Sequence, residues 1–265
     1  MNRDGINNLC DALISLVRIM ERLRAPDGCP WDAKQTEETI KIYLLEEAYE
    51  VLDAIENKDP KGTCEELGDL LFMIIFLSQI ARERNQFTLL NVLKGIKDKM
   101  IRRHPHVFGD KKVRDAGEVS ENWARIKMEE KKQSLVGILD KIPPSLPALL
   151  RAHRLSQRAA QFGFDWADKK EIWNKVREEF SELQDAIEDG DKNKVGEEIG
   201  DLIFSLVNLS RHWGLNAEDV LRGANKKFVA RFNRMVNKLK EKGIDIREAS
   251  LDKMDEAWDQ IKEDD

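Results

Sequence analysis

The 265-residue sequence contains few of the residues that mark disulfide-rich or membrane-spanning proteins. Its three cysteines, Cys10, Cys29 and Cys64, are widely spaced and odd in number, which argues against a disulfide framework and against a Cys-x-x-Cys metal site. Such cysteine usage fits a reducing cytoplasm. The longest apolar run, 70–77, is far shorter than the ~20 residues that a membrane-spanning helix needs. We therefore expect a cytoplasmic protein without a membrane partner.

Glycine and proline are also scarce, with 15 and 7 residues respectively. Hydrophobic residues make up 41% of the chain and charged residues 35%, a balance that favours an all-α fold. A basic excess is lacking, since the formal net charge is −6. Broad nucleic-acid-binding surfaces usually need clustered basic residues, so we expect no nucleic-acid partner.

The most informative feature that is present is an acidic pattern that occurs twice. Each copy has two carboxylates three residues apart and, 16 residues after the second, two more at the same interval. The copies are Glu47, Glu50, Glu66 and Asp69 in the first half, and Glu179, Glu182, Glu198 and Asp201 in the second. Residues three apart share a helix face, and four clustered carboxylates repel one another unless protons or a cation intervene. All-oxygen ligands favour Mg²⁺, with Mn²⁺ as a possible substitute, so each half predicts a metal site.

A structural alternative exists for one of these residues. Thr63 precedes Glu66 by three positions, which fits a capping box in which Glu66 only satisfies a helix N-terminus. The second half has no serine or threonine three residues before Glu198, yet it keeps the acidic pattern. Capping therefore explains one residue in one half.

Helical periodicity dominates the chain, beginning with apolar residues at three- and four-residue steps from 6 to 23. Further helices are expected at about 36–56, 89–103, 119–132, 170–188, 194–213 and 217–241. The helix that carries Glu66 and Asp69 continues into the apolar run 70–77, so we expect it to be buried on every side. Its counterpart at 202–209 has two polar interruptions, Ser205 and Asn208.

The domain boundary is predicted from proline. Three of the seven prolines lie within 140–147, which cannot form regular helix. We expect a linker at 134–148 between a first domain at 1–133 and a second at 149–265. The motifs repeat across it: Gly28-Cys29-Pro30-Trp31 is similar to Gly163-Phe164-Asp165-Trp166, and 121–127 is similar to 256–262.

Cations and aromatic residues also occur at matching places. Each half has a lysine and an arginine four residues apart on its last long helix, namely Lys99 and Arg103, then Lys227 and Arg231. Basic pairs opposite a metal suit a polyphosphate, although such pairs are also common on solvated helix faces. Trp123 and Trp258 would be able to stack on a base, with core packing as the alternative.

The acidic motifs, together with Gly-Cys-Pro-Trp-Asp at 28–32 and Arg-Arg-His-Pro-His-Val-Phe at 102–108, resemble the MazG family of nucleoside triphosphate pyrophosphohydrolases. The resemblance covers almost the whole chain. It implies two tandem four-helix-type domains in an intertwined homodimer, and Mg²⁺-dependent hydrolysis of ribo- and deoxyribonucleoside triphosphates to monophosphates and pyrophosphate, broad in base. By position, it implies metal binding by the two sets of carboxylates, phosphate contacts from Lys175, Lys194, Lys227 and Arg231, and a nucleoside contact from Trp258. Lys99, Arg103 and Trp123 would lie beside the first-half ligands.

The halves differ where the phosphates would bind. Lys175 and Lys194 precede Glu179 and Glu198 by four residues, whereas the first half has Tyr43 and Gly62 at these places. We therefore expect the second half to be the main active site and the first to be weak, specialised or structural. Its catalytic residues would be Glu179, Glu182, Glu198 and Asp201, with Glu178 or a ligand carboxylate orienting the attacking water.

Other readings remain open at this point. One is a regulatory module that binds nucleotides without hydrolysing them, and another is a structural dimer with buried acids and no metal dependence. A di-iron carboxylate bundle would need Glu-x-x-His pairs, which the acidic motifs lack. The sequence does not determine the preferred base or sugar, the physiological role or any assembly beyond a dimer.

Overall fold

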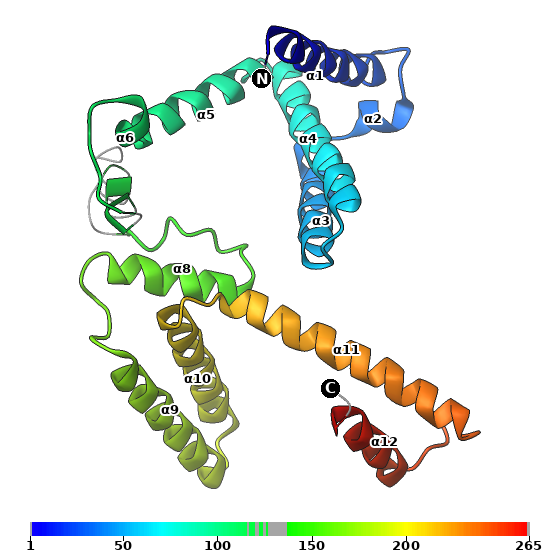
Figure 1. The fold of residues 1–265 in the computed structure, drawn as a ribbon, viewed down its shortest axis with the longest axis vertical. Coiled ribbons are helices and arrows are strands. Elements are labelled where there is room, and N and C mark those ends of the chain that lie inside the picture. Colours follow the sequence, from blue (N-terminus) through cyan, green and yellow to red (C-terminus); the bar gives the residue numbers. More distant parts are fainter. Residues whose placement is uncertain (1, 116, 120–121, 124–125, 127–136, 264–265) are drawn as a thin grey trace. The chain divides into compact units, whose positions relative to one another are not determined.

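The computed structural model describes residues 2–115, 117–119, 122–123, 126 and 137–263, and within these residues every regular element is a helix. The predicted all-α class is confirmed. The chain divides into two compact units, Met1–Glu130 and Lys131–Asp265 (Figure 1). No helix in the described part is long and apolar enough to cross a bilayer.

The first unit is built around a helical hairpin. Its helices are α1 (Arg3–Leu23), α2 (Pro30–Lys34), α3 (Glu37–Glu56), α4 (Pro60–Glu83), α5 (Leu89–Arg103) and α6 (Pro105–Phe108). Helices α3 and α4 lie side by side, and α1 packs against α4 (Figure 1). Met20 of α1, Ile40 of α3 and Phe76 of α4 are almost fully buried where these helices meet. The hairpin brings the two acidic motifs of the first half onto adjacent helices.

The second unit repeats the hairpin. Its helices are α8 (Ala148–Ala160), α9 (Lys169–Asp189), α10 (Lys192–His212), α11 (Ala217–Glu241) and α12 (Leu251–Glu263). Helices α9 and α10 form the hairpin, and α8 packs on α10 and α11. Helices α11 and α12 enclose a second small core of Met235, Leu239, Ala257 and Ile261.

Several predicted helices agree closely with the structure, and four of the described helices were not predicted. The helix expected at 89–103 is α5, and that expected at 217–241 is α11. Most of the helix expected at 119–132 lies outside the described residues, as does 134–136 of the expected linker. Sequence periodicity did not predict α2, α6, α8 and α12, of which α2 and α6 are too short to show a period.

The caps of the motif-bearing helices overturn the capping-box alternative for Glu66. Helix α4 begins at Pro60, and the Asp59 side chain accepts hydrogen bonds from the backbone N–H groups of Lys61 and Gly62, both at 3.0 Å. Helix α10 begins in the same way, because Asp191 accepts from the N–H of Asn193 at 2.9 Å. An N-cap aspartate already satisfies each N-terminus. Glu66 therefore lies in the second turn of α4, where a capping role is absent.

The prediction that α4 is buried on every side is wrong for the single chain. Leu67, Leu71 and Ile74 are 51%, 41% and 38% exposed, respectively. The equivalent residues of α10 are exposed to a similar degree: Ile199, Ile203 and Leu206 at 44%, 44% and 43%. Each set lies on one helix face, at i, i+4 and i+7. We call these two sets the exposed stripes, and each lies on the same helix as its acidic motif.

Candidate active site

The α9–α10 hairpin gathers three of the four predicted metal ligands of the second half. Carboxylate oxygens of Glu179, Glu198 and Asp201 all lie within 4.8 Å of one another. Glu179 comes from α9 and is only 6% exposed, whereas Glu198 and Asp201 come from consecutive turns of α10. Their mutual distances and oxygen chemistry fit a hard divalent cation. Glu182 is close enough to contribute to the electrostatic potential at Glu198.

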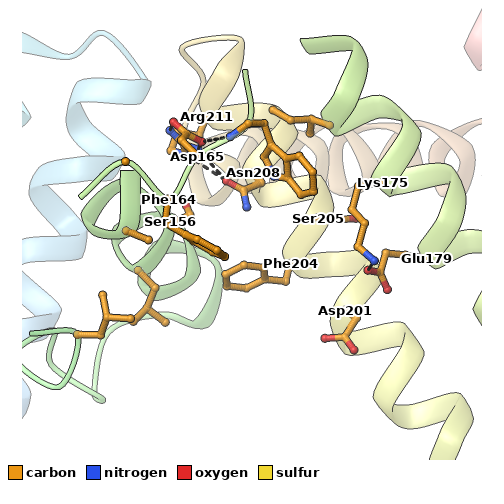
Figure 2. Close-up of a pocket in the computed structure, with 16 residues that line it drawn as sticks. Ser156, Phe164, Asp165, Lys175, Glu179, Asp201, Phe204, Ser205, Asn208 and Arg211 are labelled. Carbon is orange, nitrogen blue, oxygen red and sulfur yellow. Dashed lines mark hydrogen bonds and ion pairs between the residues drawn. The ribbon is translucent and has the colours of Figure 1, made fainter. Parts of the chain in front are cut away.

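Lys175 provides the positive charge next to this carboxylate group. Its ammonium lies 2.7 Å from a carboxylate oxygen of Glu179 (Figure 2) and 2.8 Å from one of Glu178. Hydrogen bonds to Glu178 and Glu179 raise the pKa of Lys175 above its ordinary value, so this lysine stays charged. The ion pair compensates the negative charge of the buried Glu179.

Crowding of negative charge is visible at Glu198. Partial desolvation, followed by repulsion from Glu182, Asp201 and Glu179, raises the pKa of this carboxyl above its ordinary value. The ionised form is thus disfavoured in the metal-free protein. A cation among these oxygens would remove the repulsion, and the group therefore meets the chemical requirements of a metal site.

The first half has a similar cluster of carboxylates, but it lacks a lysine at the position equivalent to Lys175. Oxygens of Glu47, Glu66 and Asp69 lie within 4.8 Å of one another. Desolvation and then repulsion among the acidic groups raise the pKa values of Glu47 and Glu66, with Glu50 contributing to both. Tyr43 occupies the place of Lys175, and its ring packs against Trp31 with 5.9 Å between centroids.

The contacts found for Lys194 and Trp258 in the described part are with residues other than the second-half carboxylates. Lys194 lies in the first turn of α10, 3.5 Å from Asp189. Trp258 packs against Phe228 of α11, with 5.4 Å between ring centroids. Lys227 and Arg231 also belong to α11 and, like Trp258, do not line the cavity described below. In the first unit, Arg103 lies over the ring of Trp123, at 5.7 Å from its centroid, and Lys99 lies on α5 one turn before Arg103.

A cavity of about 470 Å³ borders the second-half carboxylates, and sequence reasoning missed it. Its walls come from α8, α9, α10 and the 163–166 loop, and Lys175, Glu179 and Asp201 lie at one end (Figure 2). Both polar interruptions in the apolar run of α10, Ser205 and Asn208, line this cavity. These two polar residues were the signal in the sequence from which the cavity could have been predicted, because a polar residue within an apolar helix often marks a cavity or a site.

Asp165 and Arg211 form an ion pair at the other end of the cavity, which was also missed. The guanidinium of Arg211 donates to both carboxylate oxygens of Asp165, one of them at 3.0 Å, and His212 lies 2.9 Å from the same carboxylate. The hydrogen bonds from Arg211, and then that from His212, lower the pKa of Asp165 to about 2. The pair joins the 163–166 loop to the end of α10.

This ion pair predicts an acid-dependent loss of stability. Because the folded-state pKa of Asp165 is below its ordinary value of 3.8, its contribution is complete above about pH 4 and is lost as pH falls towards 2. Asp165→Asn should therefore lower the urea midpoint at pH 6, and the difference from wild type should shrink by pH 2.5. Urea unfolding followed by circular dichroism at both pH values measures this, and an equal difference at both would contradict the assignment.

Comparison with known proteins agrees with this geometry. The model of the MazG nucleotide pyrophosphohydrolase domain matches the chain twice, at residues 35–108 and 168–236. Each match contains one hairpin with its acidic motifs, which confirms the tandem repeat.

Curated relatives cover nearly the whole chain. The chain is 44% identical over 247 residues to the nucleoside triphosphate pyrophosphohydrolase/pyrophosphatase MazG of Thermotoga maritima, covering 93% of this chain and 94% of the relative. It is 44% identical over 251 residues to the nucleoside triphosphate pyrophosphohydrolase of Escherichia coli K12, covering 93% and 95%. An uncharacterized protein of Bacillus subtilis, YabN, is 42% identical over 246 residues, which are 92% of this chain and 50% of that protein. The chain belongs to the MazG nucleotide pyrophosphohydrolase family.

Proposed function

We propose that the protein hydrolyses nucleoside triphosphates between the α and β phosphates, mainly in its second half. Water and the triphosphate give a nucleoside monophosphate and pyrophosphate. The relatives named above as nucleoside triphosphate pyrophosphohydrolases share 44% of their aligned residues with this chain. The observation that carries the proposal is the convergence of Glu179, Glu198 and Asp201 beside the charged Lys175.

Mg²⁺ is the metal that we propose for this site, with Mn²⁺ as a possible substitute. Glu179, Glu182, Glu198 and Asp201 would hold it, because they supply only oxygen ligands. When bound, the ion would supply neutralisation of phosphate charge and acidification of water. The first-half group of Glu47, Glu50, Glu66 and Asp69 would hold a metal in the same way.

The positive side chains and Glu178 complete the proposed machinery. Phosphoryl transfer depends chiefly on positioning and on electrostatic stabilisation of the phosphate oxygens. Lys175 already lies among the acidic groups and would turn to a phosphate oxygen when a cation balances Glu179. Lys194 would meet the leaving pyrophosphate, and Glu178 would orient the attacking water as a base. Lys227 and Arg231 would add phosphate contacts, and Trp258 a contact to the nucleoside.

The first half lacks two of these cations and is proposed to be the weaker site. Tyr43 and Gly62 replace Lys175 and Lys194, so less positive charge faces a polyphosphate there. Lys99, Arg103 and Trp123 would still permit nucleotide binding. A regulatory module that binds nucleotide without hydrolysis is therefore the alternative function, and it applies chiefly to this half.

We also infer a homodimer in which the exposed stripes are covered. Ile199, Ile203 and Leu206 form an uncovered apolar face of α10, and on α9 Phe180 is 53% exposed. Apolar faces of this kind commonly mark protein interfaces. A second copy of the chain would cover them by pairing equivalent faces about a two-fold axis.

We further propose that a linker at 134–148 joins the two domains and that the protein is located in the cytoplasm.

Manganese binding tests the two metal sites independently of turnover. Wild-type protein should reduce the electron paramagnetic resonance signal of free Mn²⁺, with two sites per chain. Glu198→Gln should lose the second-half site and Glu66→Gln the first-half site, because each removes one negatively charged ligand. Glu263→Gln, at the exposed end of α12, is the matched control. Unchanged Mn²⁺ binding by Glu198→Gln would contradict the assignment.

A further inference from the structure

The cavity beside the second-half carboxylates has a size and lining that suit the base of a nucleotide. Its volume of about 470 Å³ lies within the ~300–1,000 Å³ that is usual for ligand pockets. Leu155, Ile172 and Phe204 give it apolar walls. The acidic end, with Glu179 and Asp201, belongs to the same cavity, so a ligand that fills it has one end at the proposed metal site.

The opposite end of the cavity is polar but electrically balanced. The Arg211 side chain is 14% exposed, and both of its Nη atoms donate to the carboxylate of Asp165. Because Asp165 neutralises the guanidinium, this end does not attract a phosphate strongly. An apolar ring with polar edges matches such a surface better than an anion does.

Asn208 is held in one orientation at this end. Its Oδ1 accepts hydrogen bonds from Nε of Arg211 at 3.2 Å and from Nη2 at 3.0 Å. A guanidinium only donates hydrogen bonds, so the amide oxygen must face Arg211 and the amide nitrogen must face away. Figure 2 shows the nitrogen of Asn208 on the side away from Arg211. Among the described residues, no hydrogen-bond acceptor is found for this nitrogen.

We propose that this cavity receives the base of the nucleoside triphosphate, and that Nδ2 of Asn208 donates a hydrogen bond to an acceptor atom on the base edge. Trp258 does not line the cavity, so its proposed contact to the nucleoside would be to the sugar. The proposal rests on the proposed function, because it assigns a subsite of the same active site. A donor fits every standard base, since adenine and guanine offer N7 and the pyrimidines offer O2. Asn208 thus selects a nucleobase as a class and tolerates all four.

The first half lacks this feature at the equivalent position. Glu66 and Glu198 are 132 residues apart (198 − 66), and the same offset makes Phe76 the first-half equivalent of Asn208. Phe76 is 1% exposed and packs in the core with Met20 and Ile40. A buried phenyl ring there fills space and donates no hydrogen bond. In the first half, the residue at this position therefore cannot donate a hydrogen bond to a base.

The test compares substrates with and without a base. Pyrophosphate release from dATP, dGTP, dCTP and dTTP, and phosphate release from inorganic tripolyphosphate, are measured with wild type and Asn208→Leu. Leucine has nearly the shape of asparagine but cannot donate. Loss of one neutral hydrogen bond should lower kcat/KM for each nucleotide, relative to tripolyphosphate, by about 2- to 10-fold, mainly through KM. Asn237→Leu on α11, the same change at an exposed asparagine outside the cavity, should leave that ratio as in wild type.

A second variant guards against misfolding of the first. Asn208→Asp keeps the side-chain shape and the contact to Arg211 but also cannot donate, so the ratio should fall at least as far. An unchanged ratio in a folded variant at this position would overturn the base subsite while leaving the hydrolase function intact. Failure of wild type to release pyrophosphate from any nucleotide would instead overturn the proposed function on which the subsite rests.

Discussion

Glu198→Gln is expected to reduce pyrophosphate release from nucleoside triphosphates at least about 100-fold, because even outer-shell partners of metal ligands contribute 10- to 100-fold. Glutamine keeps the shape of the side chain and removes the charge that Glu182, Asp201 and Glu179 oppose. The raised pKa of Glu198 shows that its ionised form is unfavourable in the metal-free fold, so the variant should be at least as stable as wild type. Steady-state assay of pyrophosphate and urea unfolding without metal measure the two effects.

Glu66→Gln is the matched control for this prediction. It makes the same chemical change at the equivalent ligand of the first half, where Tyr43 and Gly62 replace the two lysines. We expect this variant to retain most of the activity. The opposite result, with activity lost in Glu66→Gln and retained in Glu198→Gln, would place the main active site in the first half.

Ile203→Asp is expected to convert the proposed dimer into monomers. Ile203 is 44% exposed in the single chain and lies at the centre of the exposed stripe on α10. A carboxylate that is buried at an interface without a partner destabilises the interface. An uncompensated buried charge of this kind costs about 4 kcal/mol. Light scattering coupled to size-exclusion chromatography measures the mass of the wild-type and variant particles.

Loss of the dimer should also reduce turnover. Ile199 and Ile203 flank Glu198 and Asp201 on α10, so the partner chain would support the helix that carries the ligands. Displacement of reacting groups by about 1 Å can cost on the order of 100-fold in rate. Leu251→Asp, at a residue that is 70% exposed at the start of α12, is the control for a new surface charge. A monomeric wild-type protein, or a dimeric Ile203→Asp variant, would show that the stripe is not the interface.

Sequence reasoning identified the features that depend on local spacing. The three-residue steps between Glu179 and Glu182 and between Glu198 and Asp201 fix which carboxylates share a helix face, and a short turn then brings the two faces together. Gly190, with a φ of 72°, and the N-cap Asp191 make that turn. This spacing can be read directly from the sequence, which is why the cluster of carboxylates was predictable.

Features that depend on distant pairing were not predictable in the same way. Asp165 and Arg211 are separated by 46 residues, and no periodic pattern connects a loop residue with the end of α10. The expected all-round burial of α4 failed for a related reason: apolar composition shows that Leu67 and Leu71 prefer an apolar environment, but not which chain provides it. Trp258 illustrates a third case, because its sequence position does not distinguish packing on Phe228 from stacking on a base.

The most direct test of metal-dependent α–β cleavage is product analysis of a single nucleotide with Mg²⁺ and with a chelator. Wild-type protein with dATP and Mg²⁺ should give dAMP and pyrophosphate in equal amounts, resolved by anion-exchange chromatography, and excess chelator should abolish both. Reaction in ¹⁸O-labelled water should place the label in one of the two products, as expected for a single attack by water. Formation of dADP and phosphate, or equal turnover in the presence of chelator, would contradict the account.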